Sequence, residues 1–207
     1  MNRTPDPLKT ALGSPAVEAR VAARRFADRA AHRGADLFYA EEASPLGALL
    51  LVAGRRGLIV LRYDPTDVDA TLIELAERRS PRIVESAAAL DPWRRELFEY
   101  FEGTRRHFEA PLDWQDIAGF RRRVLRATAA IPYGELESYK AVATKAGSPG
   151  AARAAGNALG SNPLPIVIPC HRVRHAGGGL GGYTGGLERK RLLLAVESAR
   201  VSADEKS

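Results

Sequence analysis

The sequence predicts an α+β protein with two parts, a small domain that mixes strands and helices and a mainly helical domain that follows it. Two apolar runs around a glycine-bounded turn, GALLLVA and GLIVLRY on either side of GRRG, predict a β-hairpin in the first half. The second half reads as a series of helices separated by Gly and Pro. The chain has 207 residues, of which 45% are hydrophobic and 27% charged, so it can bury a core and has a globular composition.

The first half contains further elements on both sides of this hairpin. A helix is expected over residues 16–33, and its five arginines form a basic face that is either solvated or in contact with a phosphate backbone. After the hairpin, DPTDVDATLIELAERR predicts a helix with an aspartate cap, PRIVES a short strand, and DPWRRELFEYFEGT a helix that Gly103 ends. We therefore expect a tail and basic helix over residues 1–35 and a small α/β domain over residues 36–115.

The second half contains a pair of short helices after a longer one. IAGFRRRVLRATAAI predicts a helix that Pro132 ends. GELESYKAVATKAG and SPGAARAAGNALGSN predict two short helices joined through AGSPG, with Ser148 as the N-cap of the second, which is typical of a helix-turn-helix. The second helix is built almost wholly of Ala, Gly and one Arg, so it can lie deep in a DNA groove or pack tightly against another helix. A final helix in LERKRLLLAVES completes a domain of residues 116–200, before a tail of residues 201–207.

Cys170 is the only cysteine of the chain, and its surroundings in NPLPIVIPCHRV suggest a reactive thiol. Three prolines bracket the run IVI, which predicts a short buried strand that leads into Cys170 and fixes the thiol in one place. His171 and Arg172 follow directly, and an imidazole or a cation nearby lowers the pKa of a thiol. The spacing is compatible with a nucleophile and also with a buried cysteine beside a surface histidine.

A glycine-rich segment, RHAGGGLGGYTGGLERK, follows the cysteine and contains Tyr183 and Thr184. Its backbone groups can line a narrow slot for a planar ligand, and it lacks the pattern of a phosphate-binding loop. Glu197 of the last helix is a candidate to orient His171, as the third member of a catalytic relay does. One cysteine and four scattered histidines lack the spacing of metal ligands, so no metal is expected.

The charge and the cysteine count limit the partners and the compartment. A formal charge of +6 favours a polyanionic partner such as nucleic acid, although solubility alone also explains it. One cysteine cannot form an internal disulfide, and no apolar run is long enough for a signal peptide or a membrane span. A cytoplasmic protein that does not insert into a membrane is expected.

The motifs PYGE, SY, AAR, SNP, PCHRV and GYTGG occur in this order between Phe120 and Glu197. They resemble the O6-alkylguanine-DNA alkyltransferases, also called methylated-DNA–protein-cysteine methyltransferases. The resemblance implies a ribonuclease-H-like fold for the N-terminal domain and a DNA repair activity without a cofactor. The protein would bind double-stranded DNA that contains O6-alkylguanine or O4-alkylthymine, flip the base out and transfer its alkyl group irreversibly to Cys170. Each molecule would react once, as a monomer, and cooperative binding of several copies along DNA stays open.

The resemblance also implies roles for individual residues. His171, through a water and Glu197, would deprotonate the thiol, and Tyr139 would donate a hydrogen bond to N3 of the flipped base. Arg153 would enter the minor groove and fill the gap in the base stack. Further DNA contacts are implied at Ser148, Ala152, Asn157 and Arg172. The base pocket is implied to include Tyr139, Leu159, Tyr183, Thr184 and the backbone of Cys170 and Val173. Asn162 is implied to be the hinge between the slim helix and the cysteine.

Two departures and two rival functions accompany this resemblance. Some members bind zinc through N-terminal cysteines, which this chain lacks, and about the first 35 residues have no obvious counterpart. A sensor that binds alkylated DNA without reacting is one alternative, and a cysteine hydrolase acting on a small substrate is another. The Cys170–His171 pair argues against the sensor, and the helix-turn-helix with Arg153 argues against the hydrolase.

Overall fold

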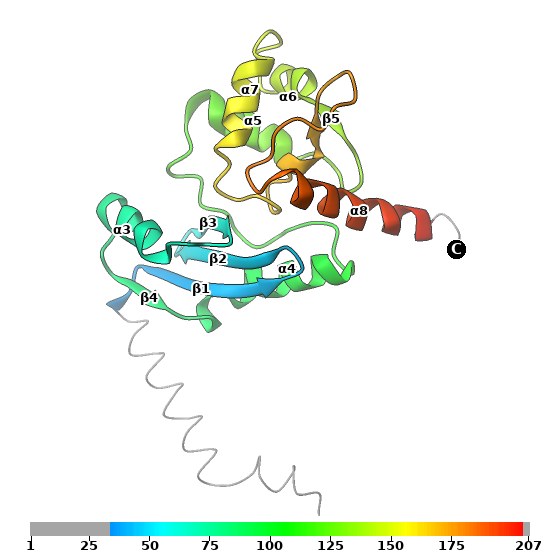
Figure 1. Ribbon diagram of the computed structural model, residues 1–207. Helices are drawn as coiled ribbons and strands as arrows, with labels where there is room; N and C mark the ends of the chain where they lie inside the picture. Colours follow the sequence, from blue (N-terminus) through cyan, green and yellow to red (C-terminus); the bar gives the residue numbers. More distant parts are fainter. Residues whose placement is uncertain (1–33, 205–207) are drawn as a thin grey trace, which may run out of the picture.

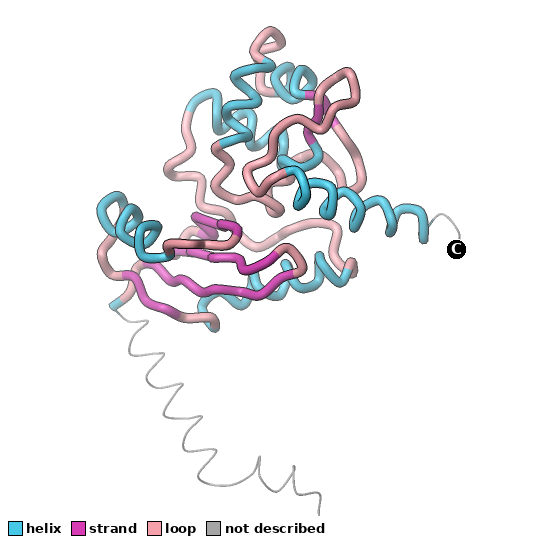
Figure 2. Tube along the Cα trace, in the orientation of Figure 1, coloured by secondary structure: helices cyan, strands magenta, loops and turns pink. Residues whose placement is uncertain are grey.

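The structure is a computed structural model that describes residues 34–204, with side chains over residues 34–197. The basic helix predicted over residues 16–33 lies outside the described residues. Figure 1 shows a twisted sheet with helices in one half of the molecule and a group of helices and loops in the other. Loops make up much of this second half (Figure 2). No described helix is long and apolar enough to span a bilayer.

The first half is built on a four-stranded sheet with the order β3-β2-β1-β4. The predicted hairpin is present as β2 (Gly47–Gly54) and β3 (Gly57–Tyr63), which pair antiparallel. Strand β1 (Leu37–Ser44) was not predicted, although it pairs with β2 and, in parallel, with β4 (Ile83–Glu85). The unpredicted strand is therefore central to the sheet.

A β-bulge in β3 determines which side chains face the interior shared with the second half. Ala53 pairs with Leu58 and Val52 with Val60, so Ile59 is an extra residue in β3. Side chains of a regular strand alternate between faces, but the extra residue puts Leu58 and Leu61 into the same core cluster. The sheet therefore presents two large leucines of its edge strand to one side.

Two helices that the sequence predicted cover the two faces of the sheet. In α3 (Val68–Arg78), the side chain of the N-cap Asp67 accepts a hydrogen bond from the Ala70 N–H at 2.8 Å. Leu75 of this helix belongs to a second, smaller cluster of buried residues that includes Leu50 and Val52 of β2. A short 3₁₀ helix, η1 (Ala88–Leu90), leads into α4 (Asp91–Glu102). Gly103 ends α4 with a φ of 73°, in the left-handed conformation that favours glycine.

The second half contains α5 (Gly119–Ala129), α6 (Tyr139–Lys145), α7 (Ala152–Gly160) and α8 (Leu187–Asp204). The first three pack against one another, so the predicted pair of short helices is present as α6 and α7.

Two predicted details of this pair are wrong. Helix α6 begins at Tyr139, because Gly134 forms a turn with a φ of 78° and β5 (Glu137–Ser138) pairs with β6 (Val173–Arg174). Ser148 is not the N-cap of α7, because its carbonyl accepts the Ala151 N–H in a turn before the helix.

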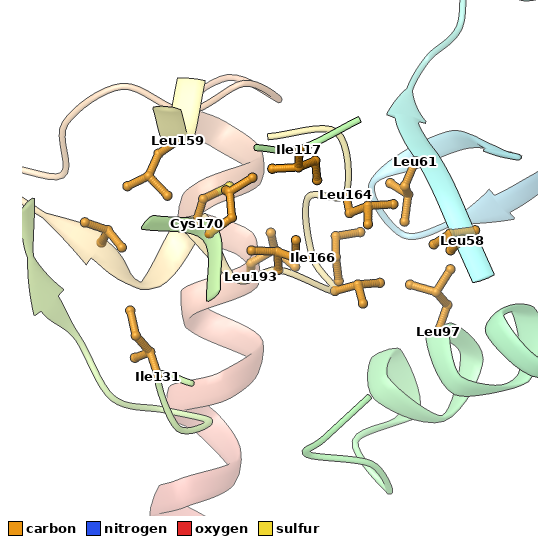
Figure 3. Packing of buried hydrophobic residues seen from close by; sticks show 14 of the residues in the cluster. Leu58, Leu61, Leu97, Ile117, Ile131, Leu159, Leu164, Ile166, Cys170 and Leu193 are labelled. Atoms are coloured by element: carbon orange, nitrogen blue, oxygen red, sulfur yellow. The ribbon is translucent and has the colours of Figure 1, made fainter. Parts of the chain in front are cut away.

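The two halves share one hydrophobic core and a hydrogen bond at the edge of β3, from Leu61 to Pro163. Leu164 and Ile166, in the loop before Cys170, lie between the sheet leucines and Leu193 of α8 (Figure 3). On the free edge of β3, the Leu58 N–H donates to the Pro111 carbonyl at 2.9 Å and the Leu61 N–H to the Pro163 carbonyl at 2.8 Å. The sheet is therefore hydrogen-bonded to the loop that leads to the cysteine.

Candidate active site

Cys170 is buried at the first position of the 3₁₀ helix η2 (Cys170–Arg172). The strand predicted before it is wrong, because the IVI run forms a tight turn. In this turn the Ile168 N–H donates to the Leu164 carbonyl at 2.8 Å, and Ile166 has a φ of 72°. A β-branched residue adopts that conformation only where the surrounding structure holds it. A strained turn therefore fixes the position of the thiol.

Asn162 holds this turn together and contacts the thiol. Its Nδ2 donates to the Ile168 carbonyl at 2.9 Å and lies 3.2 Å from the Cys170 Sγ, while its Oδ1 accepts the Leu164 N–H at 3.0 Å. The side chain is buried. The residue implied to be a hinge thus connects the end of α7 with the reactive sulfur.

His171 and Glu197 form a buried pair directly behind the cysteine. The His171 Nε2 lies 2.9 Å from the Glu197 Oε1, which also accepts a hydrogen bond from the Tyr100 hydroxyl at 2.7 Å. Burial alone would raise the pKa of Glu197, but hydrogen bonds from His171 and Arg172 hold that pKa at about 2. Burial lowers the pKa of His171, against the influence of Glu197. The imidazole is therefore neutral at neutral pH.

This pair also assigns the tautomer of the imidazole. Because Glu197 is ionised and only accepts hydrogen bonds, the His171 Nε2 carries the proton and donates it to the carboxylate. The Nδ1 then has a free lone pair, and it has no hydrogen-bond partner among the described residues. The arrangement provides a buried base in the residue that directly follows the cysteine.

Arg172 was predicted to contact DNA and, as a cation, to lower the pKa of the thiol. Its guanidinium donates to Glu197 at 2.9 Å and to the Ile131 carbonyl at 2.6 Å, and only 5% of the residue is exposed. The DNA contact predicted for Arg172 is therefore wrong, because η2 turns this side chain into the protein.

The predicted lowering of the thiol pKa is also wrong. Burial raises the pKa of Cys170 to about 11, and the hydrogen bond from Asn162 and the charge of Lys190 offset this only in part. The unreacted side chain is therefore a thiol at neutral pH.

Lys190 was not recognised from the sequence, where it lies in a run of charges on the last helix. It is fully buried, and its ammonium group donates to the carbonyls of Val173 and Leu180. These two hydrogen bonds connect α8 with β6 and with the glycine-rich segment. The carbonyl of Val173, which was expected to bind the substrate base, already accepts this hydrogen bond.

A cavity of about 610 Å³ opens beside Cys170, in the size range of small-molecule sites. The predicted residues that line it are Tyr139, Ala152, Arg153, Leu159, Cys170, Tyr183 and Thr184. Gly156, Gly160, His175 and Gly182 also line it and were not predicted. The remaining predicted residues lie outside the lining: Ser148, Asn157, Asn162, His171, Arg172, Val173 and Glu197. The predicted residues thus fall into two groups, those that line the cavity and those, such as His171 and Glu197, that form buried hydrogen bonds outside the lining.

The composition of the slim helix α7 fits its place beside this cavity. Ala152, Gly156 and Gly160 recur every four residues, so they lie on the cavity side, and a Cβ on Gly156 would come within 3.7 Å of the Tyr139 ring. Ala155 is fully buried, and Arg153 is exposed. The small residues therefore allow the tight packing of α7 against α5 and α6, and an approach of this helix to a DNA groove stays a prediction.

Among the described residues, no three His, Cys, Asp or Glu side chains gather into a group that could hold a metal ion. The chemistry that the site offers is that of a thiol with a neutral imidazole, supported by a buried carboxylate.

Comparison with known proteins relates both halves of the chain to one family. Residues 119–199 match the family model of the 6-O-methylguanine DNA methyltransferase DNA binding domain. Residues 37–114 match that of the 6-O-methylguanine DNA methyltransferase ribonuclease-like domain. A methylated-DNA–protein-cysteine methyltransferase of Mycolicibacterium paratuberculosis is 44% identical over 160 residues, which are 74% of this chain and 88% of that protein. An inducible methyltransferase of the same name from Bacillus subtilis is 41% identical over 133 residues, or 63% of this chain and 74% of that protein.

Solved structures give the same relationship. The O6-methylguanine methyltransferase of Mycobacterium tuberculosis is 37% identical, with a TM-score of 0.69, and the match covers 79% of this chain and 94% of that one. A structure of the Mycobacterium tuberculosis protein in complex with DNA is 39% identical, with a TM-score of 0.67 and the same coverage.

Proposed function

The chain belongs to the 6-O-methylguanine DNA methyltransferase family, and we propose that Cys170 is the residue that accepts the alkyl group. It is a DNA repair protein, a methylated-DNA–protein-cysteine methyltransferase that binds DNA through its helical half. The observation that carries the assignment of Cys170 is its position: the thiol lines the cavity, while Asn162 and the His171–Glu197 pair lie next to it.

The transfer is a single displacement at the alkyl carbon. The sulfur of Cys170 forms a bond to this carbon as the bond from carbon to guanine O6 breaks, and the bonding electrons pass to the base. The proton of the thiol passes to the Nδ1 of His171 through a bridging water and ends on the released guanine. Because the thiol pKa is about 11, this removal of the proton at the moment of attack is needed near neutral pH. Glu197 stabilises the imidazolium that forms for a moment.

The cavity is the proposed site of the flipped base. Tyr139, at the start of α6, would donate a hydrogen bond to N3 of the guanine, and Leu159 would pack on its ring. The Tyr183 side chain and the Thr184 N–H would contact O6. Arg153 is exposed on α7 beside the cavity and would fill the space that the base leaves in the stack. The alkylated base, rather than undamaged DNA, is thus the proposed substrate, with O4-alkylthymine as a second one.

The proposed domains are residues 36–115 and 116–200, with DNA held by the second. A monomer is proposed as the reacting species, because the described residues of one chain supply the thiol, the base and the cavity. DNA contacts from Ser148, Ala152 and Asn157 stay part of the proposal, since these residues lie at or near α7 and none is fully buried.

Intact mass spectrometry after incubation with a duplex that contains O6-methylguanine tests this function. The mass of the protein is expected to rise by one methyl group in one stoichiometric burst, since the thioether is not exchanged by cellular thiols and the chain has no second cysteine. Cys170→Ser should bind the same duplex and gain no mass. Binding without any mass change in the unaltered protein would support a damage sensor. Turnover beyond one equivalent would support a hydrolase.

A further inference from the structure

Two tyrosines from the two halves of the chain meet at the wall of the cavity. The hydroxyl of Tyr63, the last residue of β3, lies 2.6 Å from the hydroxyl of Tyr183, which lines the cavity beside Cys170. Burial raises the pKa of both phenols, so both hydroxyls keep their protons and one can donate to the other. The Tyr183 ring also stands edge-on to the His171 ring, with the ring centres 6.4 Å apart. A residue of the sheet is thus in direct contact with the reactive site.

The ring of Tyr63 is itself held between two groups of the second half. A Cβ on Gly185 would come within 2.6 Å of the Tyr63 ring, so the ring lies directly on the backbone of the glycine-rich segment. The guanidinium of Arg189 also lies over the Tyr63 ring, 5.0 Å from the ring centre. Arg189 in turn donates to the carbonyls of Leu46 at 2.8 Å and Gly185 at 3.0 Å and pairs with Asp64. These contacts fix Tyr63 relative to the segment that carries Tyr183 and Thr184.

The same strand also contacts the other side of the site. Two residues before Tyr63, the Leu61 N–H donates to the carbonyl of Pro163, next to the Asn162 that holds Cys170. Strand β3 therefore contacts both the loop that carries the thiol and the segment that carries Tyr183 in the cavity wall.

We propose that Tyr63 is a positioning residue for the alkylated base: its hydroxyl holds the Tyr183 side chain in the orientation in which it contacts the flipped base. This inference rests on the proposed function of the cavity. It gives the first half of the chain a part in the reaction, because the wall of the base pocket is then set by a side chain of the sheet. Tyr63 does not line the cavity itself, and its hydroxyl acts through Tyr183.

Single-turnover kinetics with an O6-methylguanine duplex at increasing DNA concentrations separate this role from a DNA contact. Tyr63→Phe keeps the ring and removes only the hydroxyl. We expect the transfer rate at saturating DNA to fall roughly two- to tenfold, the effect of one hydrogen bond, while the DNA concentration at half-saturation stays the same. Tyr39→Phe is the matched control, because it removes a hydroxyl from the half-buried Tyr39 on β1 of the same sheet.

A double-mutant cycle tests whether Tyr63 acts through Tyr183. Tyr183→Phe is expected to slow transfer as well, and the double variant should be no slower than the slower single variant, since both remove the same hydrogen bond. A Tyr63→Phe rate equal to that of the unaltered protein, or losses that multiply in the double variant, would overturn the proposal.

Amide hydrogen exchange tests the positioning without depending on alkyl transfer. Tyr63→Phe should speed exchange over residues 182–186 and leave α5 unchanged. Absence of methyl transfer in the unaltered protein would refute the proposed function, whereas normal transfer with unchanged exchange and unchanged kinetics in Tyr63→Phe would refute only the role of Tyr63.

Discussion

The amide of Asn162 donates to the Ile168 carbonyl at 2.9 Å and lies 3.2 Å from the sulfur of Cys170. The same nitrogen therefore stabilises the turn before the cysteine and contacts the reactive atom. A hydrogen bond to sulfur favours the thiolate, so it counteracts the effect of burial on the thiol pKa.

Asn162→Ala is expected to destabilise the protein and to raise the thiol pKa further. Removal of the side chain leaves the buried Leu164 N–H without its partner, which costs about 1–3 kcal/mol for such a group, while the Ile168 carbonyl keeps only its hydrogen bond from the Cys170 N–H. Urea unfolding measures the free energy of unfolding, and ultraviolet absorbance of the thiolate as a function of pH measures the pKa. For stability, Asn157→Ala on the exposed side of α7 is the control and should have little effect. An unchanged thiol pKa in Asn162→Ala would mean that the contact with sulfur has no electrostatic effect.

The rate of transfer should be nearly constant over neutral and mildly alkaline pH. In this range the thiol, with a pKa of about 11, is protonated and His171 is neutral, so the reactive pair is fully present. The pKa of His171 is lowered below its ordinary value of 6.5, so the rate should fall only as the pH falls below 6.5 and the imidazole becomes protonated. Quenched single-turnover reactions with a labelled duplex at a series of pH values measure how the transfer rate depends on pH.

His171→Gln should change the shape of that profile as well as its height. Without the base, only the small thiolate fraction reacts, and this fraction grows tenfold with each pH unit below the thiol pKa. The rate should then rise steadily from neutral pH, while the final extent of alkylation stays at one equivalent. A flat profile in His171→Gln would argue against His171 as the base.

Arg153→Ala should slow repair of a methylated base in duplex DNA more than reaction with the free modified guanine. The free base needs no flipping, so it does not depend on a side chain that fills the stack. Arg95→Ala is the matched control, because Arg95 is a highly exposed arginine on α4 in the first half. Equal losses on the two substrates would remove the role of Arg153 in flipping.

Glu197→Ala should lower the free energy of unfolding at neutral pH by about 3–5 kcal/mol, because it leaves the buried Arg172 without its carboxylate. The pKa of Glu197 is lowered from 4.5 to about 2, so its stabilising effect is complete above pH 4.5 and is lost as the pH falls toward 2. The difference between Glu197→Ala and the unaltered protein should therefore shrink over that acidic range. Urea unfolding at several pH values measures it, with Glu188→Ala on the exposed side of α8 as the control.

Local signals in the sequence predicted much of the fold. The hairpin, the cap at Asp67 and the end of α4 at Gly103 depend on residues that are close in sequence, and all three are present. Strand β1 lacks such a signal, because its buried residues Leu37 and Ala40 are three positions apart instead of alternating.

The site was predicted less completely, because its contacts are distant in sequence. The motifs identified the thiol, the imidazole and the carboxylate, but the direction of the Arg172 side chain depends on the η2 turn. Three prolines and an apolar run resemble a strand, although the contacts of Asn162 fold them into a turn. The pairing of Tyr63 with Tyr183 joins residues 120 positions apart, which no local pattern indicates.

The hydrogen bonds on the edge of β3 have a consequence for the protein outside the reaction. An open edge strand is a template onto which a strand of another molecule can be added, which leads to aggregation. Here the Leu58 and Leu61 N–H groups are already bonded to the Pro111 and Pro163 carbonyls, and the opposite edge, β4, is only three residues long. A fragment that ends after the sheet would expose this apolar edge and self-associate. Pro111 of the first half and Pro163 of the helical half therefore both make this edge less available for pairing with another molecule.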